Sequence, residues 1–323
     1  MSKGLLSTLL STPRPQAAIS IAGDSIAAVE LSVAKGQLSL SVQQVKSLET
    51  GAVVPSMMSP NVADQKSVTT ALKEVIGSYK RRPTRVSLVL PDIIAKVTLL
   101  SFETVPDRET DLAELIRLKV QKSAPFSLNE AQLSYEPCGV DTTKQPQFLV
   151  VVVQKSVLRE YESICDDVGL QVGCVDLASF NLINMSLYAT SEKKGDDWLL
   201  VQTANQYRTL AIIRGSQLIF HRTQASEPGN SFDNFIYQAA MYYEDRLGGD
   251  GVKHIVFASS SMGNHSDILE NVFERSFKSS NTVALEQLGS HISSTIHNAK
   301  RIPIDLLDRL AAPIGILLRD RHG

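Results

Sequence analysis

Apolar and polar residues alternate in three short runs near the start of the chain. The pairs Gly23-Asp24 and Lys35-Gly36 separate these runs and supply turn residues. The pattern predicts an antiparallel meander of three strands at residues 17–22, 26–33 and 37–45. Apolar residues then recur at helical spacing from Val68 to Tyr79, and alternation returns at residues 85–90. We therefore expect the local order βββαβ.

The next section mixes strand and helix patterns. Predicted strands cover residues 96–102, 132–136 and 147–154, and predicted helices cover residues 109–121 and 156–168. A short strand at 171–175 and a helix at 179–188 come next, and the polar stretch 190–197 is typical of a surface linker. We interpret residues 92–170 as an αβ insertion into the first unit.

The meander pattern then recurs, with predicted strands at residues 198–202, 208–214 and 217–221. It is followed by a helix at 232–247, a strand at 254–258 and a helix at 267–277. A last helix is expected at 303–319, where Pro313 must kink or interrupt it. Two βββα units on either side of an insertion predict a duplicated α/β architecture with a cleft.

Composition excludes several classes of protein. The 323 residues carry 32 Lys and Arg against 34 Asp and Glu, so the charge lacks the basic excess of nucleic-acid-binding proteins. The three cysteines show no CxxC spacing and the six histidines no HExxH motif, so we expect neither zinc nor any other metal. No apolar stretch approaches the length of a membrane span, and we expect a cytoplasmic protein.

Several segments together resemble a known family. The segments are ISIAGDSIAAVEL at 19–31, residues 86–91, Val105-Pro106, residues 114–126 ending in Ala124-Pro125-Phe126, residues 236–247 with Tyr242-Tyr243, and APIGILLR at 312–319. Their order and spacing are similar to the actin-like (ASKHA) fold of FtsA, and most closely to the type IV pilus assembly protein PilM family. The resemblance covers most of the chain.

This resemblance implies a two-lobed α/β fold that carries an inserted subdomain of the FtsA and PilM type. The expected organisation is a flexible N-terminus at 1–16, the first lobe at 17–91 and 171–195, the insert at 92–170, the second lobe at 196–300, and a C-terminal helix at 301–323 that returns to the first lobe.

In such folds two Asp-x-Gly hairpin turns hold the nucleotide phosphates and magnesium, and a Gly-Gly turn approaches the adenosine. The corresponding positions hold Ser20 and Ala22 in the first hairpin, Gln202 and Ala204 in the second, and Ser259-Ser260 at the third turn. Serine and glutamine lack the carboxylate oxygens that bind magnesium, and an alanine Cβ obstructs close approach to phosphate. Gly23 lies one place after the expected glycine, so a phosphate-binding turn shifted by one residue is the alternative.

We therefore expect no nucleotide cofactor, with magnesium and ATP as the alternative. The resemblance implies a non-catalytic scaffold, a pseudo-ATPase, in a type IV pilus or related secretion machine. The alternative is an ATP-binding PilM-type protein, whose nucleotide state signals between cytoplasmic motor ATPases and the inner-membrane complex. Weak ATPase activity is a further alternative. A sugar or acetate kinase is disfavoured because no general-base aspartate lies in a recognisable motif.

The resemblance also implies a partner. PilM proteins accept the N-terminal cytoplasmic tail of the inner-membrane protein PilN, which would keep this chain peripheral at the inner membrane. We expect the groove between the first lobe and the insert, with Val97, Leu99, Leu115 and Ile116 as partner-binding candidates or, alternatively, as ordinary core residues. Motor ATPases and a second copy of the chain are further possible partners, and nucleic acid is not.

Overall fold

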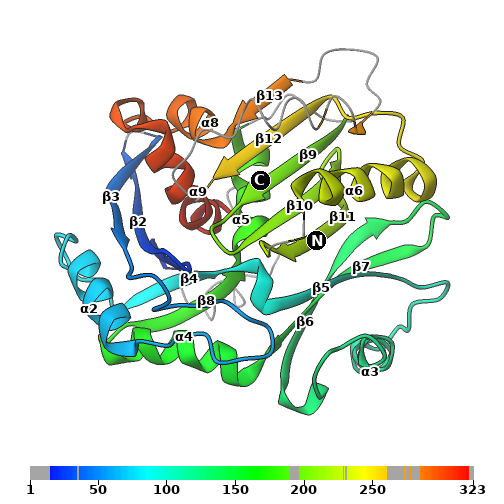
Figure 1. Ribbon diagram of the computed structural model, residues 1–323, viewed down its shortest axis with the longest axis horizontal. Helices are drawn as coiled ribbons and strands as arrows, with labels where there is room; N and C mark the ends of the chain where they lie inside the picture. The colour runs from blue at the N-terminus through cyan, green and yellow to red at the C-terminus, as the bar shows by residue number, and fades with distance from the viewer. Residues whose placement is uncertain are drawn as a thin grey trace.

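The computed structural model describes residues 15–34, 36–189, 196–227, 229, 231–259, 273, 276, 277 and 284–319. Among these residues the chain forms two five-stranded mixed sheets and one three-stranded sheet, with helices between and around them (Figure 1). None of the helices in the described part of the chain combines the length and the hydropathy that a membrane span requires.

The first lobe is built on a sheet with the strand order β3-β2-β1-β4-β8. Its antiparallel meander comprises β1 (Ala17–Ile21), β2 (Ser25–Ala34) and β3 (Gln37–Ser47). The parallel strands β4 (Arg85–Leu90) and β8 (Gln171–Leu177) continue the sheet beyond β1. Helix α2 (Gln65–Ile76) begins where the Asp64 side chain accepts a hydrogen bond from the Ser67 N–H, and it buries its apolar face in the core on that side of the sheet.

The second lobe repeats this arrangement in the order β11-β10-β9-β12-β13. Its meander comprises β9 (Asp197–Thr203), β10 (Tyr207–Arg214) and β11 (Gln217–Ala225), and β12 (His254–Ser259) and β13 (Ala284–Gln287) are parallel. The predicted pair of equivalent meanders is confirmed.

Helices α5 (Ala178–Ala189), α8 (Leu288–Thr295) and α9 (Ile304–Leu318) lie between the two sheets (Figure 1). One continuous apolar core joins them to both sheets, which explains why α5 is buried on most of its surface. Helix α6 (Phe232–Leu247) covers the other face of the second sheet and ends at Gly248, which has left-handed φ and ψ angles.

The inserted sheet has the order β5-β7-β6, formed by β5 (Ala95–Ser101), β6 (Ala131–Val140) and β7 (Pro146–Gln154). Helix α3 (Glu109–Gln121) packs on one face of it around a separate apolar core. Helix α4 (Lys155–Asp167) falls within the range 92–170 that we assigned to the insert, yet its buried side chains belong to the core of the first lobe.

Short 3-10 helices connect several elements: η1 (Asp92–Ile94), η2 (Leu128–Glu130) and η3 (Ala299–Arg301). Helix α9 runs through Pro313 without interruption, so an interruption at that residue is ruled out. Strand β13 and helix α8 were not predicted. Most of the helix predicted at 267–277, and most of the linker predicted at 190–197, lie outside the described residues.

Candidate functional site

The first hairpin turns of the two lobes have the same local geometry. The Ala22 N–H donates to the Ser25 carbonyl at 2.9 Å, and the Ala204 N–H donates to the Tyr207 carbonyl at 2.9 Å. Two residues before these alanines, Ser20 and Gln202 occupy matching positions next to the parallel strands β4 and β12. The sequence positions compared with phosphate-binding motifs are therefore structurally equivalent in the two lobes.

The two turns also contact each other across the lobe interface. A Cβ built on Gly23 would overlap the side-chain amide of Gln206 from the second turn. The Gln206 amide donates to the Val53 carbonyl of the first lobe at 3.3 Å, which holds it in this place. A side chain at residue 23 would therefore require the Gln206 side chain to move.

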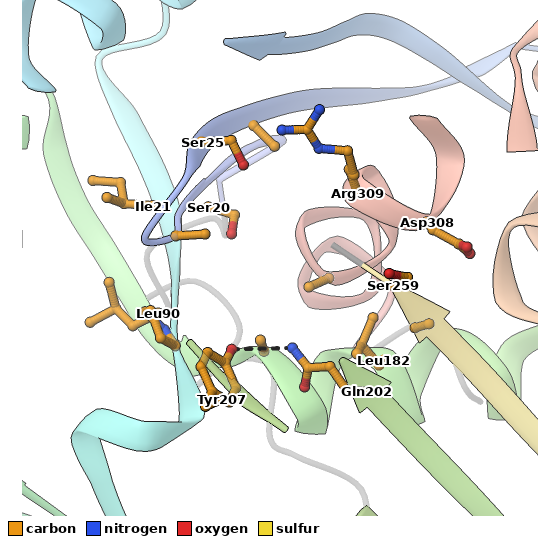
Figure 2. A pocket seen from close by; sticks show the side chains of 16 residues that line it. Ser20, Ile21, Ser25, Leu90, Leu182, Gln202, Tyr207, Ser259, Asp308 and Arg309 are labelled. Atoms are coloured by element: carbon orange, nitrogen blue, oxygen red, sulfur yellow. Dashed lines mark hydrogen bonds between the residues drawn. The ribbon is translucent and has the colours of Figure 1, made fainter. Parts of the chain in front are cut away.

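Next to these turns the lobes form a small cavity with a volume of about 40 Å³. That space holds a few water molecules, whereas ligand pockets usually measure about 300–1,000 Å³. Figure 2 shows the labelled residues around it, with β1, β9, β12 and α9 all contributing side chains. Of the predicted site residues, Ser20, Ala22, Gln202 and Ser259 line the cavity; Ala204 lies in the neighbouring turn, and Ser260 lies outside the described residues.

Gln202 is the most constrained of these side chains. It is 5% exposed, and its amide nitrogen donates to the Tyr207 hydroxyl at 3.2 Å (Figure 2). Its amide oxygen has no hydrogen-bond partner among the described residues. Burial raises the pKa of Tyr207 well above its usual value, so the hydroxyl stays protonated. The pair is neutral and offers no anionic oxygen to a cation.

The cavity also contains one carboxyl group that sequence patterns did not reveal. Asp308, on α9, accepts hydrogen bonds from the Gln287 amide at 2.7 Å and from the Gly289 N–H at 2.6 Å. Burial raises its pKa to about 7. Because Gly289 lies in the first turn of α8, the carboxyl group caps that helix from a neighbouring one. Its oxygens are therefore engaged in holding the fold.

A buried polar network joins the lobes next to the cavity. The Asp92 carboxylate, fully buried after β4, accepts hydrogen bonds from the Ser179 hydroxyl at 2.6 Å and from Thr209 of the second lobe at 3.4 Å. The Ser179 hydroxyl also lies 2.9 Å from His221 Nε2 on β11. Burial raises the pKa of Asp92 to about 6 and lowers the pKa of His221 to about 4. These groups link η1, α5, β10 and β11.

The described residues contain no group of three or more His, Cys, Asp or Glu side chains placed to hold a metal ion.

A much larger groove lies between the insert and the first lobe, with a cavity volume of about 430 Å³. One wall is a face of the inserted sheet, the opposite wall comes from β8 and α5, and Ser216 and Leu218 of the second lobe also line the groove. The apolar lining residues include Leu149, Val151, Val153, Val175, Phe180 and Ile183. The groove lies between β6 and β8, which are edge strands in their own sheets.

The structure separates the four predicted partner residues into two pairs. Val97 and Leu99 pair with Val151 and Leu149 of β7, and the β7 residues line the groove. By contrast, Ile116 is fully buried, and it belongs with the partly buried Leu115 to the core under α3, on the other face of the inserted sheet. The four residues do not form one surface.

The resemblance led us to expect a groove beside the insert, but the sequence did not indicate the lining strand, because β7 reads as a uniformly apolar run, PQFLVVVVQ. Such a run does not show which face meets the groove. Whether any of the four predicted residues contacts a partner stays a prediction.

No curated protein sequence matches this chain. The solved structure "PilM-PilN type IV pilus biogenesis complex" matches with a TM-score of 0.74 at 15% identity, over 95% of this chain and 99% of that chain. The cytoplasmic domain of EpsL, an inner membrane component of the type II secretion system of Vibrio cholerae, matches with a TM-score of 0.50 at 10% identity, over 88% of this chain and 96% of that chain.

A Bacteroides thetaiotaomicron protein of unknown function with an actin-like ATPase fold has a TM-score of 0.47 at 12% identity, over 90% of this chain and 94% of that chain. Identities this low show the fold alone, and the actin-like fold expected from the sequence is confirmed. The family model "Type IV pilus assembly protein PilM" matches residues 18–245, well over half of the chain. The chain therefore belongs to the PilM family of type IV pilus assembly proteins.

Proposed function

We propose that this protein is a non-catalytic scaffold of a type IV pilus assembly machine, which binds a short cytoplasmic segment of a PilN-like inner-membrane protein. The observation that carries the proposal is the groove of about 430 Å³ between β6 and β8. Binding there would hold the protein peripherally at the inner membrane.

The groove suits an extended peptide. Both β6 and β8 are edge strands, so a segment lying between them gains main-chain hydrogen bonds from either edge. Apolar side chains on both walls offer pockets for alternate side chains of that segment, including Leu149 and Val151 on one wall and Phe180 and Ile183 on the other. A similar solved structure is described as a PilM-PilN complex, and this supports a PilN-like partner.

The interlobe cavity supports a non-catalytic role. Its volume of about 40 Å³ is several times smaller than a nucleotide needs, and the two hairpin turns beside it touch each other at Gly23 and Gln206. Ser20 and Gln202 supply no carboxylate at the positions where the resemblance places magnesium ligands. The competing hypothesis, in which nucleotide occupancy signals to motor ATPases, requires the lobes to separate.

A binding titration tests the docking proposal. The probe is a fluorescent synthetic peptide with the sequence of the N-terminal cytoplasmic segment of the PilN-like protein from the same organism. Ser134 is exposed and lines the groove, so Ser134→Trp fills the groove without disturbing the core. We expect at least tenfold weaker binding.

The matched control is Ser32→Trp, which places the same side chain on an exposed strand position of the first lobe, outside the groove. It is expected to bind like the parent. Equal binding by the folded Ser134→Trp variant would place the docking site elsewhere.

A thermal-shift measurement tests the non-catalytic part. A ligand at 100 times its dissociation constant adds about 2.7 kcal/mol of stability, which is a shift of several degrees. We expect no such shift with millimolar magnesium and ATP. A clear shift favours the nucleotide-signalling hypothesis.

A further inference from the structure

One of the side chains that line the groove connects three parts of the fold. Arg319 follows the last residue of α9, and its guanidinium reaches across the gap between the two edge strands. It lies 2.7 Å from the Glu136 carboxylate on β6 and 3.3 Å from the Asp176 carboxylate on β8. All three residues line the groove.

The two carboxylates differ in their surroundings. The Asp176 side chain is 15% exposed and that of Glu136 is 67% exposed. Burial raises the pKa of Asp176, while the positive charge of Arg319 lowers it. The Asp176 carboxylate also accepts the Leu177 N–H at 2.8 Å, which fixes it on the strand. A carboxylate in this position is costly without a cation beside it.

Arg319 is the movable member of this group. Its side chain is 31% exposed and is held only by these two ion pairs among the hydrogen bonds and salt bridges of the described residues. The backbones of Glu136 and Asp176 belong to strands, so both carboxyl-bearing residues stay at the groove when the guanidinium leaves. A basic side chain that a docked segment brings to these carboxylates displaces the guanidinium, whereas a segment without one leaves Arg319 in its ion pairs.

We propose that Glu136 and Asp176 form a subsite for a basic side chain of the docked segment, and that Arg319 occupies this subsite in the free protein. This inference rests on the docking function proposed above. The segment and Arg319 compete for the same carboxylates, so the apparent affinity for the segment is reduced by the fraction of molecules in which Arg319 is bound. Segments without a basic residue at this position forgo the ion pairs and bind less tightly.

The geometry also predicts discrimination between partners. An acidic side chain placed at this subsite would meet two carboxylates of like charge, one of them largely buried. Guanidinium suits the subsite better than ammonium, because its planar fork contacts both carboxylates at once, as Arg319 does here.

The experiment is a double-mutant cycle between protein and peptide. One probe is the peptide described above, the segment of the PilN-like protein, and the second is the same peptide with each Lys and Arg replaced by norleucine. Both are titrated against the parent, Arg319→Gln and Glu136→Gln. Arg301→Gln serves as the control, because it removes an equal charge at an exposed position away from the groove.

We expect Arg319→Gln to bind the basic peptide about five- to tenfold more tightly than the parent, and Glu136→Gln to bind it about five- to tenfold less tightly. The norleucine peptide should bind all four proteins within about twofold. Thermal unfolding checks that each variant is folded. If Arg319→Gln does not fold, Arg319→Lys replaces it, and this variant should bind the basic peptide more tightly than the parent by a smaller factor.

Two results overturn the inference in different ways. If the basic and norleucine peptides respond equally to every substitution, the docking function stands and the basic subsite is wrong. If neither peptide binds the parent or any variant, the docking function fails and the inference fails with it.

Discussion

Gly23 and Gln206, which belong to equivalent hairpin turns of the two lobes, touch so closely that any side chain on Gly23 would overlap the glutamine amide. The Gln206 amide in turn donates to the Val53 carbonyl at 3.3 Å. Both turns also contribute residues to the lining of the interlobe cavity, among them Ala22 and Tyr207. Gly23, which the resemblance offered as a displaced phosphate-binding glycine, therefore packs against the second lobe in this structure.

This contact predicts a coupling between the two residues. In Gly23→Ala the Gln206 side chain must move and its hydrogen bond to Val53 is lost, at a cost of about 1 kcal/mol in the free energy of unfolding. Gln206→Ala loses the same bond and makes room for the methyl group. The double variant should therefore be no less stable than Gln206→Ala alone. Urea unfolding measures all four proteins, and additive losses would contradict the contact.

Nucleotide binding should return only when the missing groups are restored together. Ser20→Asp with Ala22→Gly, combined with Gln202→Asp and Ala204→Gly, supplies carboxylates for magnesium and lets phosphate approach the backbone. We expect a thermal shift with magnesium and ATP in the fourfold variant and none in the parent. ATP without magnesium is the control, because the new carboxylates act through the cation. Tight binding by the parent would contradict this prediction.

Helices α5 and α9 should tolerate no added side chain where their backbones meet. A Cβ on Gly315 of α9 would overlap the carbonyl of Asn181 on α5, and a backbone carbonyl cannot rotate away as a side chain can. Gly315→Ala is expected to lower the free energy of unfolding by about 2–3 kcal/mol, in spite of the better helix propensity of alanine. Chemical denaturation provides the measurement. A variant as stable as the parent would show that the helices separate at little cost.

The buried His221 predicts a dependence of stability on pH. Its pKa is lowered from 6.5 to about 4 by burial, so between these values the unfolded chain binds more protons than the folded one. The histidine therefore makes stability rise with pH over this range, and the gain is lost as the pH falls. In His221→Gln that contribution is absent.

The stability of the parent relative to this variant should decrease by up to about 3 kcal/mol from pH 6.5 to pH 4. The comparison with the variant is needed because Asp92 and Asp308, whose pKa values are raised to about 6 and about 7, make stability fall as the pH rises. Parallel pH profiles for parent and variant would show that His221 does not titrate as described.

The sequence alone determined the elements whose pattern is local. Both meanders were predictable because side chains in a strand alternate between faces and because glycine-containing pairs mark the turns. The repeat of that pattern implied a duplicated fold, and the strand order of the two sheets confirms it. The resemblance identified the replacements Ser20 and Gln202, and the strand registers place both residues shortly before equivalent turns.

Other features depend on which elements meet in space. Glu136 and Arg319 are 183 residues apart, and no local pattern marks them as partners. Asp308 looks like an ordinary helix-surface acid until α8 is placed against α9. Helix α4 has the same apolar face whether it packs on the insert or on the first lobe, and only the assembled core decides between them. Tertiary packing decided these points, because burial and partner choice depend on contacts that periodicity does not encode.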